Sequence, residues 1–219
     1  MSSGNFKQDV YAQLARVATA LGHANRLELL EFVAQGPRSV EELAKMTRLS
    51  VANASKHLQD LRRAGLVRAR KEGLRVFYEL AGADVVDLLT ALREVAQTRL
   101  AEVEQLLRLY ITARDDLEPI PAAELLERAR KGLVTVLDVR PPEEYAAGHL
   151  PGAINVPVSV IAGQLKRLPK GREVIAYCRG PYCLLSVDAV ALLRRKGFKA
   201  RRLEDGFPEW KASGLPVEN

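Results

Sequence analysis

From residue 39 to 80 the chain reads SVEELAKMTRLSVANASKHLQDLRRAGLVRARKEGLRVFYEL, and this stretch decides the fold of the first half. Ser39 caps a short predicted helix, with Glu42 in the capping-box position three residues later. Ser50 is the next N-cap, and the helix that it opens ends at Gly65. Two strand-like runs follow, LVRAR and RVFYEL, and the four residues KEGL that join them predict a hairpin.

Two helices joined by a tight turn and followed by an arginine-rich hairpin are typical of a winged helix-turn-helix, whose second helix lies in the major groove of DNA. With Ala54, Leu58 and Leu61 turned to the core, that helix presents small and amide side chains that can approach base edges. The basic side chains at its end and in the hairpin would contact phosphates. The predicted DNA-binding residues are Ala52, Asn53, Ser55, Lys56, Gln59, Arg62, Arg63, Arg68, Arg70, Lys71 and Arg75.

The positive charge of the chain is concentrated in the same segment. The 219 residues include 33 Lys and Arg against 27 Asp and Glu, a net charge of +6. Between Arg48 and Arg75 there are eight basic and two acidic residues, so that stretch carries the whole excess. A local basic footprint favours double-stranded DNA as a partner, the alternative being a solvated basic surface. His57 has no second candidate ligand nearby in the sequence, and we interpret it as a packing or hydrogen-bonding residue.

Amphipathic helices are predicted on both sides of this region. Apolar residues recur at three- and four-residue spacing over residues 5–20 and again over 84–113. A single helix over the second range would be ~40 Å long, more than a domain of this size covers, so part of its apolar face is left for a partner. Because the polar segment RDDLEPIP follows, we predict domains at 1–113 and 121–219 with a linker at 114–120.

Beyond Pro121 short apolar strand runs alternate with helices. The runs LVTVLDV, AINVPV, EVIAYC and ARRL are typical of strands, and PPEEYAAG, residues 158–168, LLSVDAVALLRRKG and FPEWKASG of helices or turns. This alternation predicts an α/β domain with a mostly parallel sheet covered on both faces. No apolar run reaches the ~18 residues of a membrane span and the start lacks a signal-peptide layout, so we expect a cytoplasmic protein without a membrane partner.

Both cysteines lie within six residues, CRGPYC, between the strand run EVIAY and a helix that starts near Leu184. A loop that closes onto a helix N-terminus gathers backbone N–H groups at one point and stabilises an anion there. Cys178 is therefore the predicted nucleophile, with its thiol pKa lowered from ~8.5 into the range of ~3.5 to 7.5. Arg179 is expected to add positive charge, Gly180 to support the turn, and Cys183 to supply a second thiol.

Three chemistries could use such a thiolate. A cysteine phosphatase needs an arginine six residues after the cysteine, where this chain has Leu184. Thioredoxin-type exchange has two residues between its cysteines, whereas this loop has four. Sulfur transfer remains. Nothing in the sequence indicates a cofactor, and two cysteines are too few for an all-protein zinc site, so no metal site is predicted.

The run from Leu21 to Leu80 resembles the ArsR/SmtB group of bacterial transcriptional repressors, with their leucine-rich helix, the recognition-helix pattern S-x-x-x-x-S-x-H-L beginning at Ser50, and the basic wing. The resemblance covers about residues 5–113 and implies a homodimer, built from the first and last helices, on an inverted-repeat operator. The predicted interface residues are Val10, Leu14, Leu92, Val103 and Leu106. The first half has no cysteine and its last helix no histidine, so the chain departs from the metal-sensing patterns of this group.

The second half, residues 119–219, resembles a single rhodanese domain. The residues that carry the resemblance are VLDVRPPEEYAAGHLPGAINVPV, the YC at a strand end, and LEDGFPEWKASGLPV. In rhodaneses the loop cysteine accepts a sulfane sulfur as a persulfide, and the resemblance assigns that role to Cys178. Asp138 and Arg140 are then expected to brace the loop or a neighbouring ion pair, without taking part in the chemistry, and His149 is expected to be structural.

Two departures from the rhodanese pattern matter. Asp205 stands before Gly206 where the family usually has two glycines, and an aspartate tolerates left-handed backbone if the turn needs it. Cys183 takes the last loop position, where sulfurtransferases commonly have a basic or hydroxyl side chain that holds an anionic donor. This departure weakens the expectation of efficient thiosulfate turnover.

Three functions remain open for a chain that combines a mainly α winged helix-turn-helix domain with an α/β rhodanese-like domain. The first is a transcriptional repressor that senses reactive sulfur or thiol redox state, its partner being a sulfane sulfur donor or a small thiol. The second is a rhodanese-type sulfurtransferase that uses its DNA-binding half for dimerisation or gene targeting. The third is an arsenic- or soft-metal-responsive repressor, whose two thiolates per chain would leave the coordination incomplete.

Overall fold

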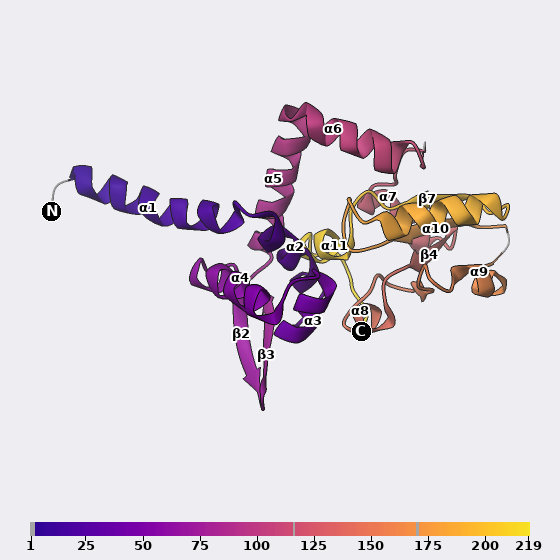
Figure 1. The fold of residues 1–219 in the computed structure, drawn as a ribbon. Coiled ribbons are helices and arrows are strands. Elements are labelled where there is room, and N and C mark those ends of the chain that lie inside the picture. The colour runs from indigo at the N-terminus through magenta and orange to yellow at the C-terminus, as the bar shows by residue number, and fades with distance from the viewer. Residues whose placement is uncertain (1–2, 116, 170) are drawn as a thin grey trace. The chain divides into compact units, whose positions relative to one another are not determined.

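A computed structural model describes residues 3–115, 117–169 and 171–219 of the chain (Figure 1). The chain forms two compact units, Met1–Val85 and Val86–Asn219. The predicted fold class is confirmed, because the first unit is helical with a small antiparallel sheet and the second is α/β with a parallel sheet. The segment predicted as a linker, 114–120, falls inside the second unit, and its role as a domain boundary stays a prediction.

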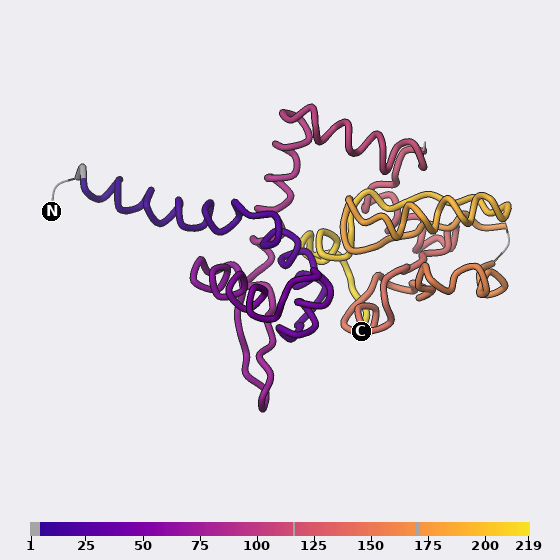
Figure 2. Tube along the Cα trace, in the orientation of Figure 1, coloured from indigo at the N-terminus to yellow at the C-terminus, as the bar shows by residue number. Residues whose placement is uncertain are grey.

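The first unit consists of helices followed by a hairpin. Its elements are α1 (Ser3–Leu21), α2 (Ala24–Val33), β1 (Arg38–Ser39), α3 (Val40–Met46), α4 (Val51–Arg63), β2 (Val67–Glu72) and β3 (Arg75–Leu80). The three strands pair antiparallel in the order β1-β3-β2. Helix α1 extends away from the other helices of this unit (Figure 2). Its apolar residues Phe6, Tyr11 and Leu14 are exposed.

The helix-turn-helix elements form for the reasons that the sequence predicts. Ser39 and Glu42 make a reciprocal capping box, with donor–acceptor distances of 3.3 Å from Glu42 N to Ser39 Oγ and 2.9 Å from Ser39 N to Glu42 Oε2. Ser50 Oγ accepts a hydrogen bond from Asn53 N at 3.2 Å and so caps α4. The residues of α4 that face the core are, as predicted, Ala54, Leu58 and Leu61.

The hairpin between β2 and β3 has a shorter turn than predicted. The strands remain paired as far as Glu72 opposite Arg75, so Gly73 and Leu74 alone connect them. The expected four-residue connection is therefore wrong, because Lys71 and Glu72 belong to the strand. Gly73 has φ of 58°, the left-handed conformation that a two-residue hairpin turn requires and that glycine adopts without steric cost.

The second unit has a four-stranded parallel sheet in the order β5-β4-β6-β7. Its strands are β4 (Val134–Asp138), β5 (Ile154–Asn155), β6 (Glu173–Tyr177) and β7 (Ala200–Arg202). Helix α5 (Asp84–Arg99) begins with the last two residues of the first unit and continues in the second. The other helices of the second unit are α6 (Ala101–Leu107), η1 (Arg108–Thr112), α7 (Ala122–Arg130), α8 (Pro142–Ala146), α9 (Ile161–Gln164), η2 (Leu165–Arg167), α10 (Leu184–Arg195) and α11 (Phe207–Ala212). All five residues of β4 are buried, as expected for a central strand of a covered parallel sheet.

Two hydrophobic clusters make up the core of this unit. One contains Val190 and Leu193 of α10 together with both cysteines, and the other contains Leu125 of α7 and Trp210 of α11. Alternate residues of β6 contribute to the two clusters, because successive strand side chains point to opposite faces of a sheet. No helix among the described residues is long and apolar enough to cross a membrane.

The single helix predicted over residues 84–113 is wrong. The chain turns sharply between α5 and α6 (Figure 2) because Leu100, with φ of −113° and ψ of 108°, has left the helical region. Thr98 precedes the break, and its hydroxyl donates to the carbonyl oxygens of Glu94 at 2.8 Å and Val95 at 3.3 Å. Such back-bonding by threonine bends helices.

Helix α7 was not predicted from the sequence. Pro121 precedes it, and Leu125 anchors it in the core. Its exposed side carries the i,i+4 ion pairs Glu124–Arg128 and Glu127–Lys131. The charge spacing of these pairs and the apolar spacing around Leu125 are the local signals of this helix, which lies between the predicted linker and the first strand of the sheet.

Candidate functional site

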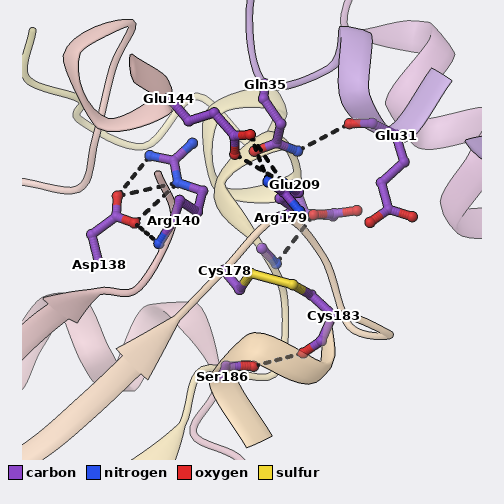
Figure 3. The surroundings of a disulfide bond; sticks show 11 residues. Glu31, Gln35, Asp138, Arg140, Glu144, Cys178, Arg179, Cys183, Ser186 and Glu209 are labelled. Carbon is purple, nitrogen blue, oxygen red and sulfur yellow. Dashed lines mark hydrogen bonds and ion pairs between the residues drawn. A yellow bond between two sulfur atoms is a disulfide. The ribbon is translucent and has the colours of Figure 1, made fainter. Parts of the chain in front are cut away.

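The two cysteines close a six-residue loop between β6 and α10 (Figure 3). Cys178 follows the last residue of β6, and Cys183 is the N-cap of α10. Their Sγ atoms form a disulfide, with the two Cα atoms 6.2 Å apart. The residues are 1% and 8% exposed. The structure therefore describes the oxidised form of the pair, and Cys183 lies within bonding reach of the predicted nucleophile.

The loop is held tightly at both ends. Cys183 N donates to Gly180 O at 3.1 Å, which closes the turn. Ser186 Oγ donates to Cys183 O at 3.1 Å, which ties the loop to the first turn of α10. Phe207 N donates to Cys178 O at 3.0 Å, which ties the other end to α11.

The backbone at Gly206 packs directly against this loop. A Cβ atom added to Gly206 would lie 2.4 Å from the carbonyl carbon of Arg179 and 2.4 Å from Gly180 N, so a larger residue does not fit. Glu209 Oε2 accepts a hydrogen bond from Gly206 N at 3.1 Å and fixes this backbone in place. Asp205, which precedes the glycine, has no left-handed backbone, so the conformational tolerance expected of it is not used.

The charge of Arg179 is balanced by a buried carboxylate. Its Nε lies 3.0 Å from both oxygens of Glu144, and its Nη2 lies 2.8 Å from Oε1 (Figure 3). Glu144 is fully buried. The positive charge expected beside Cys178 is thus offset by Glu144, a partner that the sequence analysis did not predict.

Asp138 and Arg140 form a fully buried ion pair, with Arg140 Nη2 2.7 Å from Asp138 Oδ2 (Figure 3). Burial by itself would lower the pKa of Arg140, but its hydrogen bonds and charge attraction to Asp138 raise that pKa overall. Asp138 also accepts a hydrogen bond from the hydroxyl of Tyr177, whose pKa is raised by burial and by the Asp138 charge. Tyr177 immediately precedes Cys178, so these contacts lie beside the loop; that Asp138 and Arg140 brace it stays a prediction.

Asp205 precedes Gly206, the residue that packs against the cysteine loop, and is half-buried near other carboxylates. Its pKa is raised by burial first and then by the charges of Glu209 and Glu204, while Arg93 acts in the opposite direction. His149, which was expected to be structural, is buried and stacked on Tyr145 with ring centroids 3.7 Å apart.

In the first unit the predicted DNA-binding side chains lie at the surface. Ten of the eleven predicted residues are exposed, and Ser55 is half-buried. Gln59 Nε2 donates to Ser55 Oγ at 3.3 Å, while Arg63 pairs with Asp60 and Arg70 with Glu72. Contact of these residues with DNA stays a prediction.

His57 on α4 packs against His23, with ring centroids 4.5 Å apart. Its Nδ1 atom is buried without a hydrogen-bond partner among the described residues. Burial is the main cause that lowers the pKa of His57, and the charges of His23 and Arg26 add to it. In the described parts of the chain, no three His, Cys, Asp or Glu residues are grouped closely enough to hold a metal ion.

Two residues of the site had no role assigned to them from the sequence, the buried carboxylates Glu144 and Glu209. Each follows a proline near the start of a short helix, in the strings PPEEY and FPEW. Acidic residues are favoured in the first turn of a helix, so these positions carried a signal for a helix start. Their partners are 35 and 116 residues away in the chain, and no local pattern identifies them.

Comparison with known proteins agrees with this two-part organisation. The bacterial regulatory protein family arsR matches residues 23–69, and the rhodanese-like domain family matches residues 121–213. The HTH-type transcriptional regulator Rv0324 of Mycobacterium tuberculosis is 45% identical over 206 residues, 94% of this chain and 90% of that protein. A sulfurtransferase of Allochromatium vinosum is 34% identical over 85 residues, 38% of this chain and 78% of that protein.

Among solved structures, the homodimeric winged helix-turn-helix DNA-binding domain Mb0332 of Mycobacterium bovis is 41% identical. It covers 46% of this chain and 91% of its own, with a TM-score of 0.42. The similarity to Rv0324 extends over both units and nearly the full length of each protein. The chain therefore belongs to the ArsR-family HTH-type transcriptional regulators that carry a rhodanese-like domain after the helix-turn-helix.

Proposed function

We propose that this transcriptional regulator senses sulfane sulfur through Cys178 and Cys183 and thereby changes its affinity for an operator. The observation that carries the proposal is the disulfide between the two cysteines in the rhodanese loop. A rhodanese loop needs one cysteine to carry a persulfide. A second cysteine that can reach the first gives the loop a way to store the signal as a covalent bond.

The chemistry begins with the Cys178 thiolate, which attacks the sulfane sulfur of a persulfide or polysulfide R–S–SH. The donor's S–S bond breaks, Cys178–S–SH forms, and R–S⁻ leaves. The Cys183 thiolate then attacks the inner sulfur on Cys178, which forms the Cys178–Cys183 disulfide and releases HS⁻. Two thiols are oxidised to a disulfide, and the sulfane sulfur is reduced to hydrosulfide. The product of these two steps would be the Cys178–Cys183 disulfide, the bond that the structure contains.

The DNA part of the proposal is supported by the exposed side chains of α4 and of the β2–β3 hairpin, where the excess positive charge of the chain is concentrated. A homodimer is supported by apolar residues that the single chain leaves exposed. These include Leu14 on α1, 58% exposed, and Leu92 on α5, 40% exposed. A two-fold dimer would place two copies of α4 on an inverted repeat.

A sulfurtransferase activity is the second candidate, favoured by the similarity of the second unit to the Allochromatium vinosum sulfurtransferase. Turnover requires that a persulfide on Cys178 be passed to an external thiol. The adjacent Cys183 competes for that persulfide, so the sensor proposal expects slow turnover with thiosulfate. Turnover faster in Cys183→Ser than in the wild type would fit this competition.

The sensor proposal is tested with sodium tetrasulfide, intact-protein mass spectrometry and gel shifts on a duplex taken from upstream of the protein's own coding sequence. Wild type should form the disulfide and change its DNA affinity. Cys178→Ser should lose both responses, and Cys183→Ser should retain one extra sulfur atom on Cys178 with a blunted DNA response. If the DNA affinity of Cys178→Ser responds to tetrasulfide like that of wild type, the sensor proposal is wrong.

A further inference from the structure

Residues 86–99 of helix α5 and the cysteine loop both lie in the second unit, and two side chains of α5 contact the surroundings of the loop. Arg93 and Gln97 are four residues apart and therefore share one face of the helix. Gln97 Nε2 is 2.9 Å from the hydroxyl of Tyr182, and Arg93 Nη2 is 2.5 Å from Glu209 Oε1. Neither contact was predicted from the sequence, since the partners are 85 and 116 residues apart.

The residue that Gln97 contacts, Tyr182, is the sequence neighbour of Cys183. Tyr182 directly precedes Cys183, whose Sγ has to move when the disulfide opens or closes. The loop has little freedom to absorb that movement elsewhere. Its turn is closed by the Cys183 N to Gly180 O hydrogen bond, and Cys183 is also the N-cap of α10. A change at Cys183 is therefore transmitted to Tyr182.

The residue that Arg93 contacts, Glu209, holds the backbone of Gly206, which packs against the same loop. One carboxylate oxygen of Glu209 pairs with Arg93, and the other accepts from Gly206 N. Gly206 packs so closely on the backbone of Arg179 and Gly180 that no Cβ would fit. A displacement of Arg179 or Gly180 must therefore move Gly206, and with it the carboxylate that holds Arg93.

Helix α5 also has an uncovered apolar stripe. Leu88, Leu92 and Val95 recur at helical spacing and are 38%, 40% and 60% exposed. The helix that contacts the cysteine loop is thus the same helix that offers apolar surface to a second copy of the chain.

We propose that Gln97 and Arg93 couple the state of the Cys178–Cys183 pair to helix α5, with Tyr182 and Glu209 as the positioning residues on the loop side. The inference rests on the proposed function and names the route by which that function reaches the DNA-binding assembly. It requires no new reactant, since only the disulfide opens or closes. Allosteric couplings typically change an affinity by about five- to 150-fold, and we expect a change of operator affinity within this range.

The test measures the ratio of operator affinities with and without sodium tetrasulfide in the full-length chain, alongside sulfur uptake by intact mass. Gln97→Leu removes the hydrogen bond to Tyr182 while leaving the loop sequence unchanged. It should take up sulfur and form the disulfide at the wild-type rate, yet its affinity ratio should fall below about two-fold. Gln97→Glu, which can accept a hydrogen bond from the Tyr182 hydroxyl, should restore the wild-type ratio.

Tyr182→Phe deletes only the hydroxyl and should reduce the ratio as Gln97→Leu does. The double variant should show no further loss, because both changes break one contact. Tyr110→Phe is the matched control, since Tyr110 is exposed and its hydroxyl has no partner among the described residues; it should keep the wild-type ratio.

Three outcomes would overturn the inference. A wild-type ratio in both Gln97→Leu and Tyr182→Phe would show that the contact carries no coupling, and the sensor proposal would survive. Slower disulfide formation in Gln97→Leu would place Gln97 in the sulfur chemistry instead of in its transmission. A response to tetrasulfide in Cys178→Ser would remove the proposed function itself, and the coupling would fall with it.

Discussion

Among single residues, Asp138 is expected to have a large effect on stability because it is the anionic partner of a fully buried arginine. Asp138→Asn removes the carboxylate charge that pairs with Arg140 in a site with no exposed surface. Loss of one partner of a buried ion pair costs about 3–5 kcal/mol of unfolding free energy. Urea unfolding followed by fluorescence reports this unit, because Trp210 is the chain's single tryptophan and lies in its core.

Asp188→Asn is the matched control for this prediction. Asp188 pairs with Arg114 at the surface, with side chains 40% and 45% exposed. A surface ion pair contributes about 0–1 kcal/mol, so this variant should unfold nearly as wild type does. Equal losses in the two variants would contradict the structural role assigned to the Asp138–Arg140 pair.

His57 is expected to make the first unit less stable at acidic pH. Burial, His23 and Arg26 lower its pKa in the folded state, so between the folded and unfolded pKa values the unfolded chain binds more protons. This contribution to stability is present above the unfolded value of 6.5 and is lost as the pH falls toward the folded value. Thermal unfolding by circular dichroism should show the loss in wild type and a smaller one in His57→Gln. An unchanged pH dependence in the variant would show that His57 is not its source.

At the scale of elements, the β2–β3 hairpin is expected to supply phosphate contacts. Arg68 and Arg70 are exposed on β2, and replacing both with alanine should weaken binding to all DNA sequences alike. The slope of log affinity against log salt should shrink by up to about two, since each phosphate contact contributes about 0.9. Fluorescence anisotropy at several salt concentrations measures this. The control is the double variant Arg130→Ala and Arg172→Ala, which removes two exposed arginines of the second unit and should leave the slope unchanged. An equal reduction of the slope in the control would contradict phosphate contact by the β2–β3 hairpin.

The same scale shows what the sequence could predict. Helices α3 and α4 were predicted correctly because their signals are local, namely Ser39 with Glu42 and the buried positions of α4. The break at Leu100 was not predicted, since no glycine or proline marks it and the apolar spacing continues beyond it. The hydrophobic pattern of a bent helix looks like that of a straight one over so short a range.

The candidate site divides in the same way. The spacing of Cys178 and Cys183 between a strand and a helix predicted the candidate loop, because that signal lies within six residues, and the structure joins the two cysteines in a disulfide. The contacts of the loop with Glu144 and Gln97 were not predicted from the sequence, because only the tertiary fold brings these residues to the loop. A local sequence pattern can therefore predict a candidate reactive group, whereas the residues that contact it come from the structure.

For the whole molecule, the central expectation is that assembly and operator binding depend on the same apolar faces. Leu92 on α5 is 40% exposed in the single chain, although a leucine on a stripe with Leu88 and Val95 is more stable when buried. In a two-fold dimer each copy contributes the same patch, so one substitution changes the interface twice. Leu92→Asp therefore places two carboxylates in a surface that would otherwise exclude water.

We expect wild type to be a dimer at micromolar concentration in multi-angle light scattering and Leu92→Asp to be a monomer with wild-type circular dichroism. The monomer should also lose affinity for the inverted repeat by far more than for a single half-site, since only a dimer engages both halves at once. Leu74→Asp is the control, because Leu74 is fully exposed at the turn of the hairpin and lies on neither α1 nor α5. This variant should remain dimeric. A wild-type monomer, or a Leu92→Asp dimer that binds the repeat normally, would show that α5 is not the assembly surface and that coupling of the cysteine loop to α5 has no route to DNA through the dimer.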